Sequence, residues 1–188
     1  MNPRKLFAAI TLTLILTASA SRAGAQAAPA AAAEVVPNPV SATVKTQMAR
    51  FSKNIVAGAE AMPADKYGFK PTPDMMTFGH LVIHIAQSNN LLCSKLSGTA
   101  APDTKMEETD GKDKLVAGLK ASFDFCSTTL ANVDDAKLDE QIKLFGDRMV
   151  PRAAAWIGLS GGWNDHYSAE AIYLRLNGIL PPSAQPKK

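Results

Sequence analysis

The sequence contains no long run of basic residues, and its opposite charges nearly balance. The chain of 188 residues has 20 basic and 17 acidic residues. Residues 1–25 include Arg4, Lys5 and Arg22 but no acidic residue, so the rest of the chain has 17 of each and no formal net charge. Binding to nucleic acid requires clustered Lys and Arg side chains that neutralise phosphates. The charge pattern therefore argues against a nucleic-acid partner.

Long hydrophobic segments are also scarce. The main one, residues 6–20, follows two basic residues and precedes an Ala-Gly-Ala pattern that ends at residue 25, which is typical of a secretory signal peptide. It is short for a membrane span, and neither a nearby cysteine for a lipid anchor nor a twin arginine accompanies it. We therefore expect a signal peptide over residues 1–25, export to the periplasm or the extracellular space, and no stable membrane span after cleavage.

Cysteine is rare, and Cys93 and Cys126 are the only two. In an exported chain an even number of cysteines favours a disulfide, whereas the alternative is a pair of small buried thiols. Both residues fall on predicted helices that could face each other, and because an oxidising compartment favours the bond, we expect them to be paired. The bond would stabilise the fold by about 3–4 kcal/mol through chain entropy.

Four stretches have the apolar period of amphipathic helices, with apolar residues recurring every three or four positions. Thr77 or Asp74 can cap the second helix, which stops before Gly98, and Gly178 follows the fourth. The predicted helices cover residues 41–61, 78–96, 112–132 and 151–177, the first with Ser41 as its N-cap. We therefore predict an all-α fold, an up-down four-helix bundle over residues 41–182.

The segments outside these helices lack a hydrophobic period. Residues 26–40 are rich in Ala and Pro and predict a flexible leader, and residues 183–188 predict a disordered tail. We expect Tyr67 and Phe69 to fold back onto the end of the bundle from their loop. Residues 133–150 could form either a turn of helix or an extended segment, and the Ser-Gly-Gly at 160–162 predicts a kink or a close packing contact in the last helix.

The sequence has three histidines, and their placement suggests a metal site. His80 and His84 lie one helical turn apart in the second predicted helix, and His166 lies in the last one. Side chains four residues apart project from one face of a helix, as paired metal-binding histidines do.

Several blocks of the sequence resemble the DinB-like (YfiT-like) family of four-helix bundles. They are AMPADKYGFKPTPDMMTFGHLVIHIAQSNNLLCSKLSG, SFDFC and NDHYSAEAIYLRLNGILPP, and the last resembles exported family members. The resemblance implies a divalent ion, Zn or Ni, held by one histidine of the second helix and two of the last. His84 and His166 match two of these positions. Gly162 occupies the position of the third ligand, and Ala169 that of a family glutamine.

Two residues are candidates for the missing third ligand. His80 shares a helix face with His84, and Glu170 lies four residues after His166. Two histidines with a carboxylate are a known zinc ligand set. If His80 binds the ion, Glu170 is free to orient an imidazole or to act as a general base on a metal-bound water. The competing interpretation is that His80 is solvated, Glu170 is a surface charge and the pair His84 and His166 is a remnant.

Two functional hypotheses follow. In the first, the protein is an exported metal-dependent enzyme, a hydrolase or a thiol-dependent transferase as in the family it resembles, and the ion acts as a Lewis acid. In the second, the bundle is non-catalytic and binds a small ligand or a protein partner, with a vestigial metal site. The family resemblance also implies that the bundle could pair as a homodimer through an exposed helix face.

Overall fold

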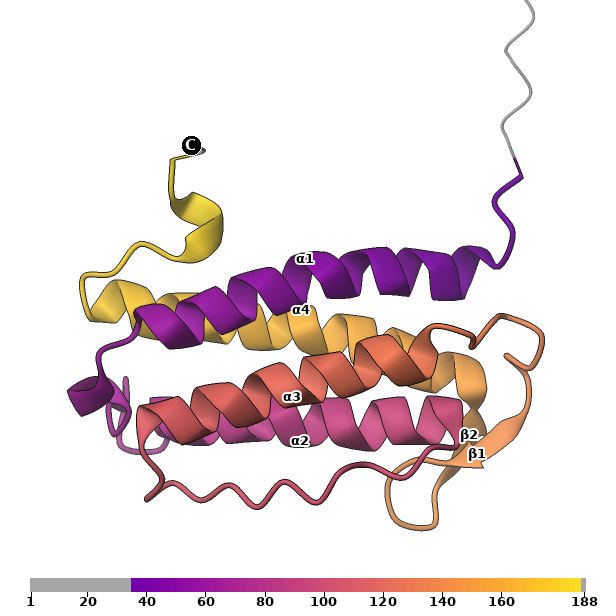
Figure 1. Ribbon diagram of the computed structural model, residues 1–188, viewed down its shortest axis with the longest axis horizontal. Helices are drawn as coiled ribbons and strands as arrows, with labels where there is room; N and C mark the ends of the chain where they lie inside the picture. Colours follow the sequence, from indigo (N-terminus) through magenta and orange to yellow (C-terminus); the bar gives the residue numbers. More distant parts are fainter. Residues whose placement is uncertain (1–34, 187–188) are drawn as a thin grey trace, which may run out of the picture. The chain divides into compact units, whose positions relative to one another are not determined.

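The computed structural model describes residues 35–186, and the bundle that they form contains four long helices (Figure 1). The predicted signal peptide and most of the predicted leader lie outside the described residues, as do residues 187–188. The elements are α1 (Pro39–Ala61), η1 (Ala64–Lys66), α2 (Phe78–Ser97), α3 (Lys112–Leu130), β1 (Gln141–Lys143), β2 (Met149–Pro151), α4 (Arg152–Leu176) and η2 (Pro182–Ala184). The predicted all-α class is confirmed. No helix among residues 35–186 is long and apolar enough to cross a membrane.

The ends of the helices follow local chemistry. The hydroxyl of Thr77 accepts a hydrogen bond from the backbone N–H of His80 at 2.9 Å, so Thr77 is the N-cap of α2. Gly98 ends α2 with a φ of 74°, which favours glycine because it has no Cβ. At α1 the prediction was wrong by two residues. The helix begins at Pro39, whose fixed φ suits the first turn, and Ser41 is buried inside it.

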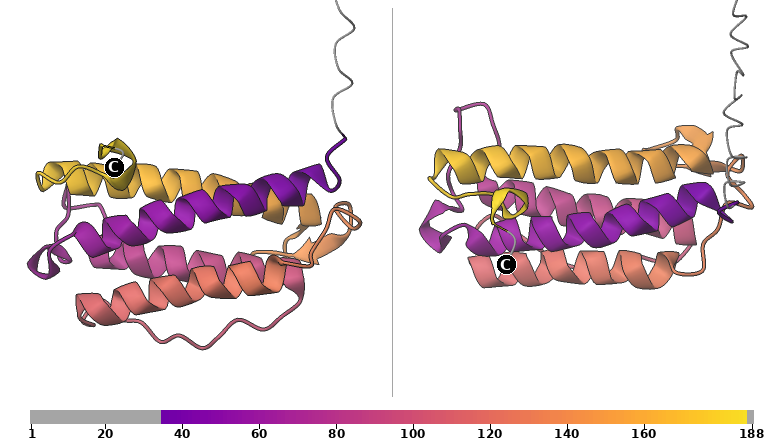
Figure 2. Two further views of the ribbon diagram at one scale, coloured as in Figure 1. Left: turned by 45° about the horizontal axis from the view of Figure 1, so that its top comes forward. Right: turned by 90° about the horizontal axis from the view of Figure 1, so that it is seen from above.

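The helices do not simply alternate in direction, as an up-down bundle would (Figures 1 and 2). The side chain of Lys112, at the start of α3, donates to the carbonyl of Met62 just after α1, and that of Lys45, near the start of α1, donates to Ala131 just after α3. Helix α3 is therefore antiparallel to α1. Helix α2 is also antiparallel to α1, because the backbone N–H of Gly79 at its start donates to the carbonyl of Tyr67, shortly after the end of α1, at 2.8 Å. Arg152, at the start of α4, donates to Leu96 at the end of α2, so α4 is parallel to α1.

The crossover between α2 and α3, residues 99–111, makes this order possible. A segment of this length spans up to about 45 Å when extended, whereas the 19 residues of α3 form a helix about 28 Å long. The crossover runs back along the bundle (Figure 1), and Met106 from it packs against Gly118 of α3. The sequence predicted a loop between the second and third helices, but it did not predict that this loop returns along the full length of α3.

The core is cross-linked and capped as the sequence predicted. Cys93 of α2 and Cys126 of α3 form the predicted disulfide, with a Cα–Cα distance of 5.2 Å. Tyr67 and Phe69 fold back onto the end of the bundle. Tyr67 packs edge-on against Phe78 at 5.1 Å between ring centroids, and its hydroxyl donates to the carbonyl of Ala59 at 2.7 Å.

The irregular segments gain structure from tertiary contacts. Within residues 133–150 the extended alternative is correct, because β1 and β2 pair antiparallel with Ile142 opposite Val150. The predicted disordered tail is wrong for residues 183–186. There the backbone N–H of Ser183 donates to the hydroxyl of Tyr167 at 2.9 Å and η2 packs near α1. Helix α4 runs unbroken through residues 160–162.

Candidate functional site

Two of the predicted site residues, His84 and His166, lie side by side. His84 comes from the middle of α2 and His166 from the middle of α4. Their rings meet edge to face, with 4.9 Å between centroids and an interplanar angle of 84°. Both are half-buried at a cavity of about 230 Å³, the histidine cavity, whose lining also includes Ser88, Asn89, Phe145, Gly162 and Trp163. The antiparallel packing of α2 and α4 brings the two rings together at the same height.

The surroundings of His166 favour its neutral form. Burial lowers the pKa of this histidine, the neighbouring His84 lowers it further, and Asp165 opposes the shift. The Nδ1 atom of His166 is buried and has no hydrogen-bond partner among residues 35–186. Buried polar atoms are normally satisfied, so such an atom calls for an explanation.

His80, one of the two candidates for the third ligand, does not lie with the pair but contacts Glu108. Its Nδ1 lies 2.7 Å from a carboxylate oxygen of Glu108, and the other oxygen accepts a hydrogen bond from Thr77 at 2.7 Å. Glu108 belongs to the crossover, which passes over the start of α2. The four-residue spacing places His80 and His84 on one side of α2, but different segments pack against them. The crossover contacts the first turn, where His80 lies, and α4 contacts the middle of the helix, where His84 lies. His80 is therefore part of an exposed hydrogen-bonded contact with Glu108.

Glu170 also lies apart from the pair, although it is four residues after His166. The side chain is completely buried and points at Gly58 of α1. Neither carboxylate oxygen has a hydrogen-bond partner within the described part of the chain. Burial raises the pKa of Glu170 well above its usual range, because a charged carboxylate is poorly solvated there. Because the carboxyl lies against Gly58 and not at the two imidazoles, the geometry gives no support to the predicted role as a general base.

A model of the DinB superfamily matches residues 47–160, more than half of the chain. The protein belongs to the DinB superfamily. A DinB-like protein from Bacillus subtilis, YjoA, is 25% identical, with a TM-score of 0.61 over 77% of this chain and 99% of that one. A DinB-like protein from Bacillus cereus is 15% identical, with a TM-score of 0.60 over 74% and 93% of the two chains. A conserved protein from Enterococcus faecalis is 16% identical, with a TM-score of 0.55 over 71% and 94%. No curated protein matches the sequence.

The donor set of this DinB bundle does not fit a resident zinc or nickel ion. Zinc in proteins usually has at least three protein ligands, and no group of three His, Cys, Asp or Glu side chains that could hold an ion exists within residues 35–186. At Gly162, where the family resemblance led us to expect a third ligand, a Cβ would lie 3.6 Å from Cε1 of His166. A Cβ would therefore fit there in ordinary van der Waals contact.

The sequence analysis missed a polar network behind the histidine cavity of this DinB protein. The indole N–H of Trp163 donates to the side-chain oxygen of Asn89 at 2.7 Å, and the Asn89 amide donates to Ser122 at 3.0 Å. All three residues are buried. The signal was present in the sequence, because Asn89 interrupts the apolar face of an otherwise amphipathic helix.

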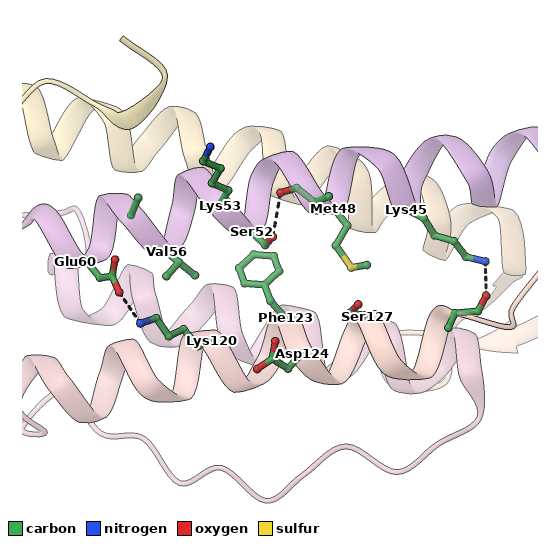
Figure 3. Close-up of a pocket in the computed structure, with 13 residues that line it drawn as sticks. Lys45, Met48, Ser52, Lys53, Val56, Glu60, Lys120, Phe123, Asp124 and Ser127 are labelled. Atoms are coloured by element: carbon green, nitrogen blue, oxygen red, sulfur yellow. Dashed lines mark hydrogen bonds and ion pairs between the residues drawn. The ribbon is translucent and has the colours of Figure 1, made fainter. Parts of the chain in front are cut away.

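The larger hollow of the DinB bundle lies elsewhere, between α1 and α3 (Figure 3). It is a groove of about 930 Å³ with Met48, Val56 and Phe123 along it. The ion pair between Glu60 and Lys120, 2.5 Å apart, and the hydrogen bond from Lys45 to Ala131 bridge it (Figure 3). No histidine or cysteine lines it. The smaller histidine cavity is therefore the candidate functional site, because it combines concave shape with titratable groups.

Proposed function

We propose that this DinB-superfamily protein binds a small, uncharged polar molecule in the histidine cavity and does not work as a metal-dependent enzyme. The observation that carries the proposal is the buried Nδ1 of His166, which has no partner among the described residues and lies beside a second imidazole. Because this atom is buried, the imidazole ring must turn to bring it to the cavity, where a bound hydroxyl or amide group would supply the missing hydrogen bond. The metal-dependent hydrolase or thiol transferase implied by the family loses support because the third ligand is missing.

The chemistry of the lining narrows the class of ligand. Apart from the two histidines, the cavity is lined by uncharged residues, with Ser88 and Asn89 as further polar groups and Leu92, Leu159 and Trp163 as apolar walls. A charged ligand would lose its hydration without a countercharge. A compact molecule with one apolar side and one hydroxyl matches both the walls and the volume of about 230 Å³.

We also propose that the protein is exported and works in an oxidising compartment. The features of residues 1–25 support export. The Cys93–Cys126 bond supports the compartment, because such bonds persist mainly outside the reducing cytosol.

The test uses the mature chain without a histidine tag and phenol as the probe. In NMR spectra of ¹⁵N-labelled protein we expect phenol to shift the ring nitrogens of His84 and His166. His166→Phe should remove the response, while the control His80→Phe should keep it. If millimolar phenol and simple alcohols leave both rings unshifted, the ligand site is refuted.

A metal-binding experiment tests the competing hypothesis of a metal-dependent enzyme. Calorimetric titration with Zn²⁺ or Ni²⁺ should show no tight binding to the wild type, and stoichiometric binding at micromolar concentration would overturn the proposal. Gly162→His should create a three-imidazole set next to His166 and raise Zn²⁺ affinity by at least about tenfold, since a third ligand completes a common coordination set. Gly161→His is the matched control, because it places the same side chain on the next position of α4.

A further inference from the structure

The histidine cavity follows the line along which α2 and α4 meet, and one row of residues from each helix lines it. Residues 84, 88 and 92 are four apart on α2, and residues 158, 162 and 166 are four apart on α4, so each set lies on one side of its helix. The two helices are antiparallel, and the imidazole rings at residues 84 and 166 touch. The rows therefore pair in three steps: His84 with His166, Ser88 with Gly162, and Leu92 with Gly158.

The cavity changes from polar to apolar along this line. The two imidazoles form one end, and Leu92 and Gly158 form the other, eight residues away along each helix. Eight residues of helix correspond to about 12 Å, or roughly two turns. A Cβ at Gly158 would meet no atom of the described residues within 4 Å. The apolar end therefore has room that a side chain at this position would fill.

Phe145 adds an aromatic ring to the apolar end. It lies in the turn between β1 and β2, and the backbone N–H of Arg152 donates to Glu140 at 2.8 Å and so ties this hairpin to the start of α4. The hairpin lies where α2 ends and α4 begins (Figure 1), so Phe145 reaches the cavity from the side of Gly158. The preceding residue, Leu144, is buried in the core, whereas Phe145 is 58% exposed. Its ring therefore offers contact surface that the chain itself does not cover.

We propose that the histidine cavity takes an alcohol that carries an aromatic ring, with the hydroxyl at the two imidazoles and the ring against Phe145 and Gly158. This inference rests on the proposed function and adds the class of ligand. A short carbon chain must separate the hydroxyl from the ring, because the polar and apolar ends of the cavity lie about two helical turns apart. A ring against Phe145 gains an aromatic pair in addition to the burial of apolar surface.

Two alcohols of different length test the distance between the ends. In titrations of the untagged mature chain, we compare phenol with phenylpropanol, whose hydroxyl ends a three-carbon chain. Phenylpropanol should bind at least about tenfold more tightly, because only it reaches the apolar end. Gly158→Leu should fill that end, cancel the advantage of phenylpropanol and preserve the response of the histidine rings to phenol. Gly161→Leu is the matched control, because the same change on α4 lies outside the cavity lining, and it should leave both alcohols unaffected.

A saturated analogue tests the aromatic contact. Cyclohexylpropanol has the same carbon skeleton and hydroxyl, and the wild type should bind it at least about threefold more weakly than phenylpropanol, because it cannot form an aromatic pair. Phe145→Ala should remove this preference. Met149→Ala should keep it, because Met149 is similarly exposed on the same hairpin but does not line the cavity. Circular dichroism checks that each variant is folded.

The outcomes separate this proposal from the one on which it rests. Equal binding of phenol and phenylpropanol, equal binding of phenylpropanol and its saturated analogue, or a preference that persists in Phe145→Ala would refute the aromatic alcohol while phenol still shifts the histidine rings. If no alcohol shifts those rings, the proposed function itself fails.

Discussion

The carboxylate of Asp135 caps the start of α1 from a distant part of the chain. One of its oxygens accepts a hydrogen bond from the backbone N–H of Ser41 at 2.8 Å, and the other accepts one from Val40 at 2.9 Å. Asn38 returns the contact by accepting from the backbone N–H of Asp135 at 3.3 Å. The first N–H groups of a helix have no partner inside it. Asp135 therefore joins the segment after α3 to the first turn of α1.

Asp135→Ala should lower the free energy of unfolding by about 1–2 kcal/mol, the usual cost of losing an N-cap. Burial raises the pKa of Asp135, but the hydrogen bonds from Ser41 and Val40 outweigh it and lower the pKa overall. The stabilisation by Asp135 is therefore fully present above the pKa of an aspartate in the unfolded chain. It is lost as the pH falls through the lower pKa of Asp135 in the folded protein. Urea denaturation between pH 7 and pH 3 measures both effects. An equal deficit for Asp135→Ala at pH 7 and at pH 3 would contradict this account.

The Cys93–Cys126 bond closes a loop with a sequence separation of 33 residues. The double variant Cys93→Ala/Cys126→Ala should be about 3–4 kcal/mol less stable than the oxidised wild type, because the unfolded chain loses the constraint. Denaturation of both proteins with and without dithiothreitol provides the measurement. The reductant should destabilise the wild type and leave the variant unchanged, and a reductant-insensitive wild type would count against the bond.

Gly58→Ala should destabilise the bundle by about 1–3 kcal/mol, the usual cost of overpacking a core. A Cβ at this position would lie 2.7 Å from the carboxyl carbon of Glu170. The clash should be relieved in Gly58→Ala/Glu170→Ala, which removes the obstructing carboxyl. A double-mutant cycle from urea midpoints measures the coupling. Additive effects of the two changes would show that the side chains do not compete for this space.

Glu170 should make the protein less stable as the pH rises. Burial raises its pKa, so above the pKa of an unfolded glutamate the folded state holds a proton that the unfolded state has released. Glu170→Gln removes this titration. Its stability relative to the wild type should therefore increase from pH 4 to pH 8, as measured by thermal unfolding. An unchanged difference across that range would mean that Glu170 does not titrate abnormally.

The sequence predicted the helices, the disulfide and the nearness of His84 to His166, because those depend on periodicity, on compartment and on family resemblance. The direction of α3 could not be predicted from the sequence. Residues 99–111 are long enough either to join two antiparallel helices by a loose loop or to return along the whole bundle. The contact of His80 with Glu108 could not be predicted for the same reason. Only the path of the crossover brings Glu108 to that histidine. Likewise, the burial of Glu170 could not be predicted, because its carboxyl packs against Gly58, which lies 112 residues earlier in the sequence.

The return crossover has a consequence for the speed of folding. Neighbouring antiparallel helices can form as a local hairpin, but α2 and α3 run in the same direction and can pair only after residues 99–111 have been laid back along them. Their contacts, including Cys93 with Cys126, therefore join residues far apart in sequence. A higher mean sequence separation of contacts slows folding. This bundle should thus fold more slowly than an alternating four-helix bundle of equal length.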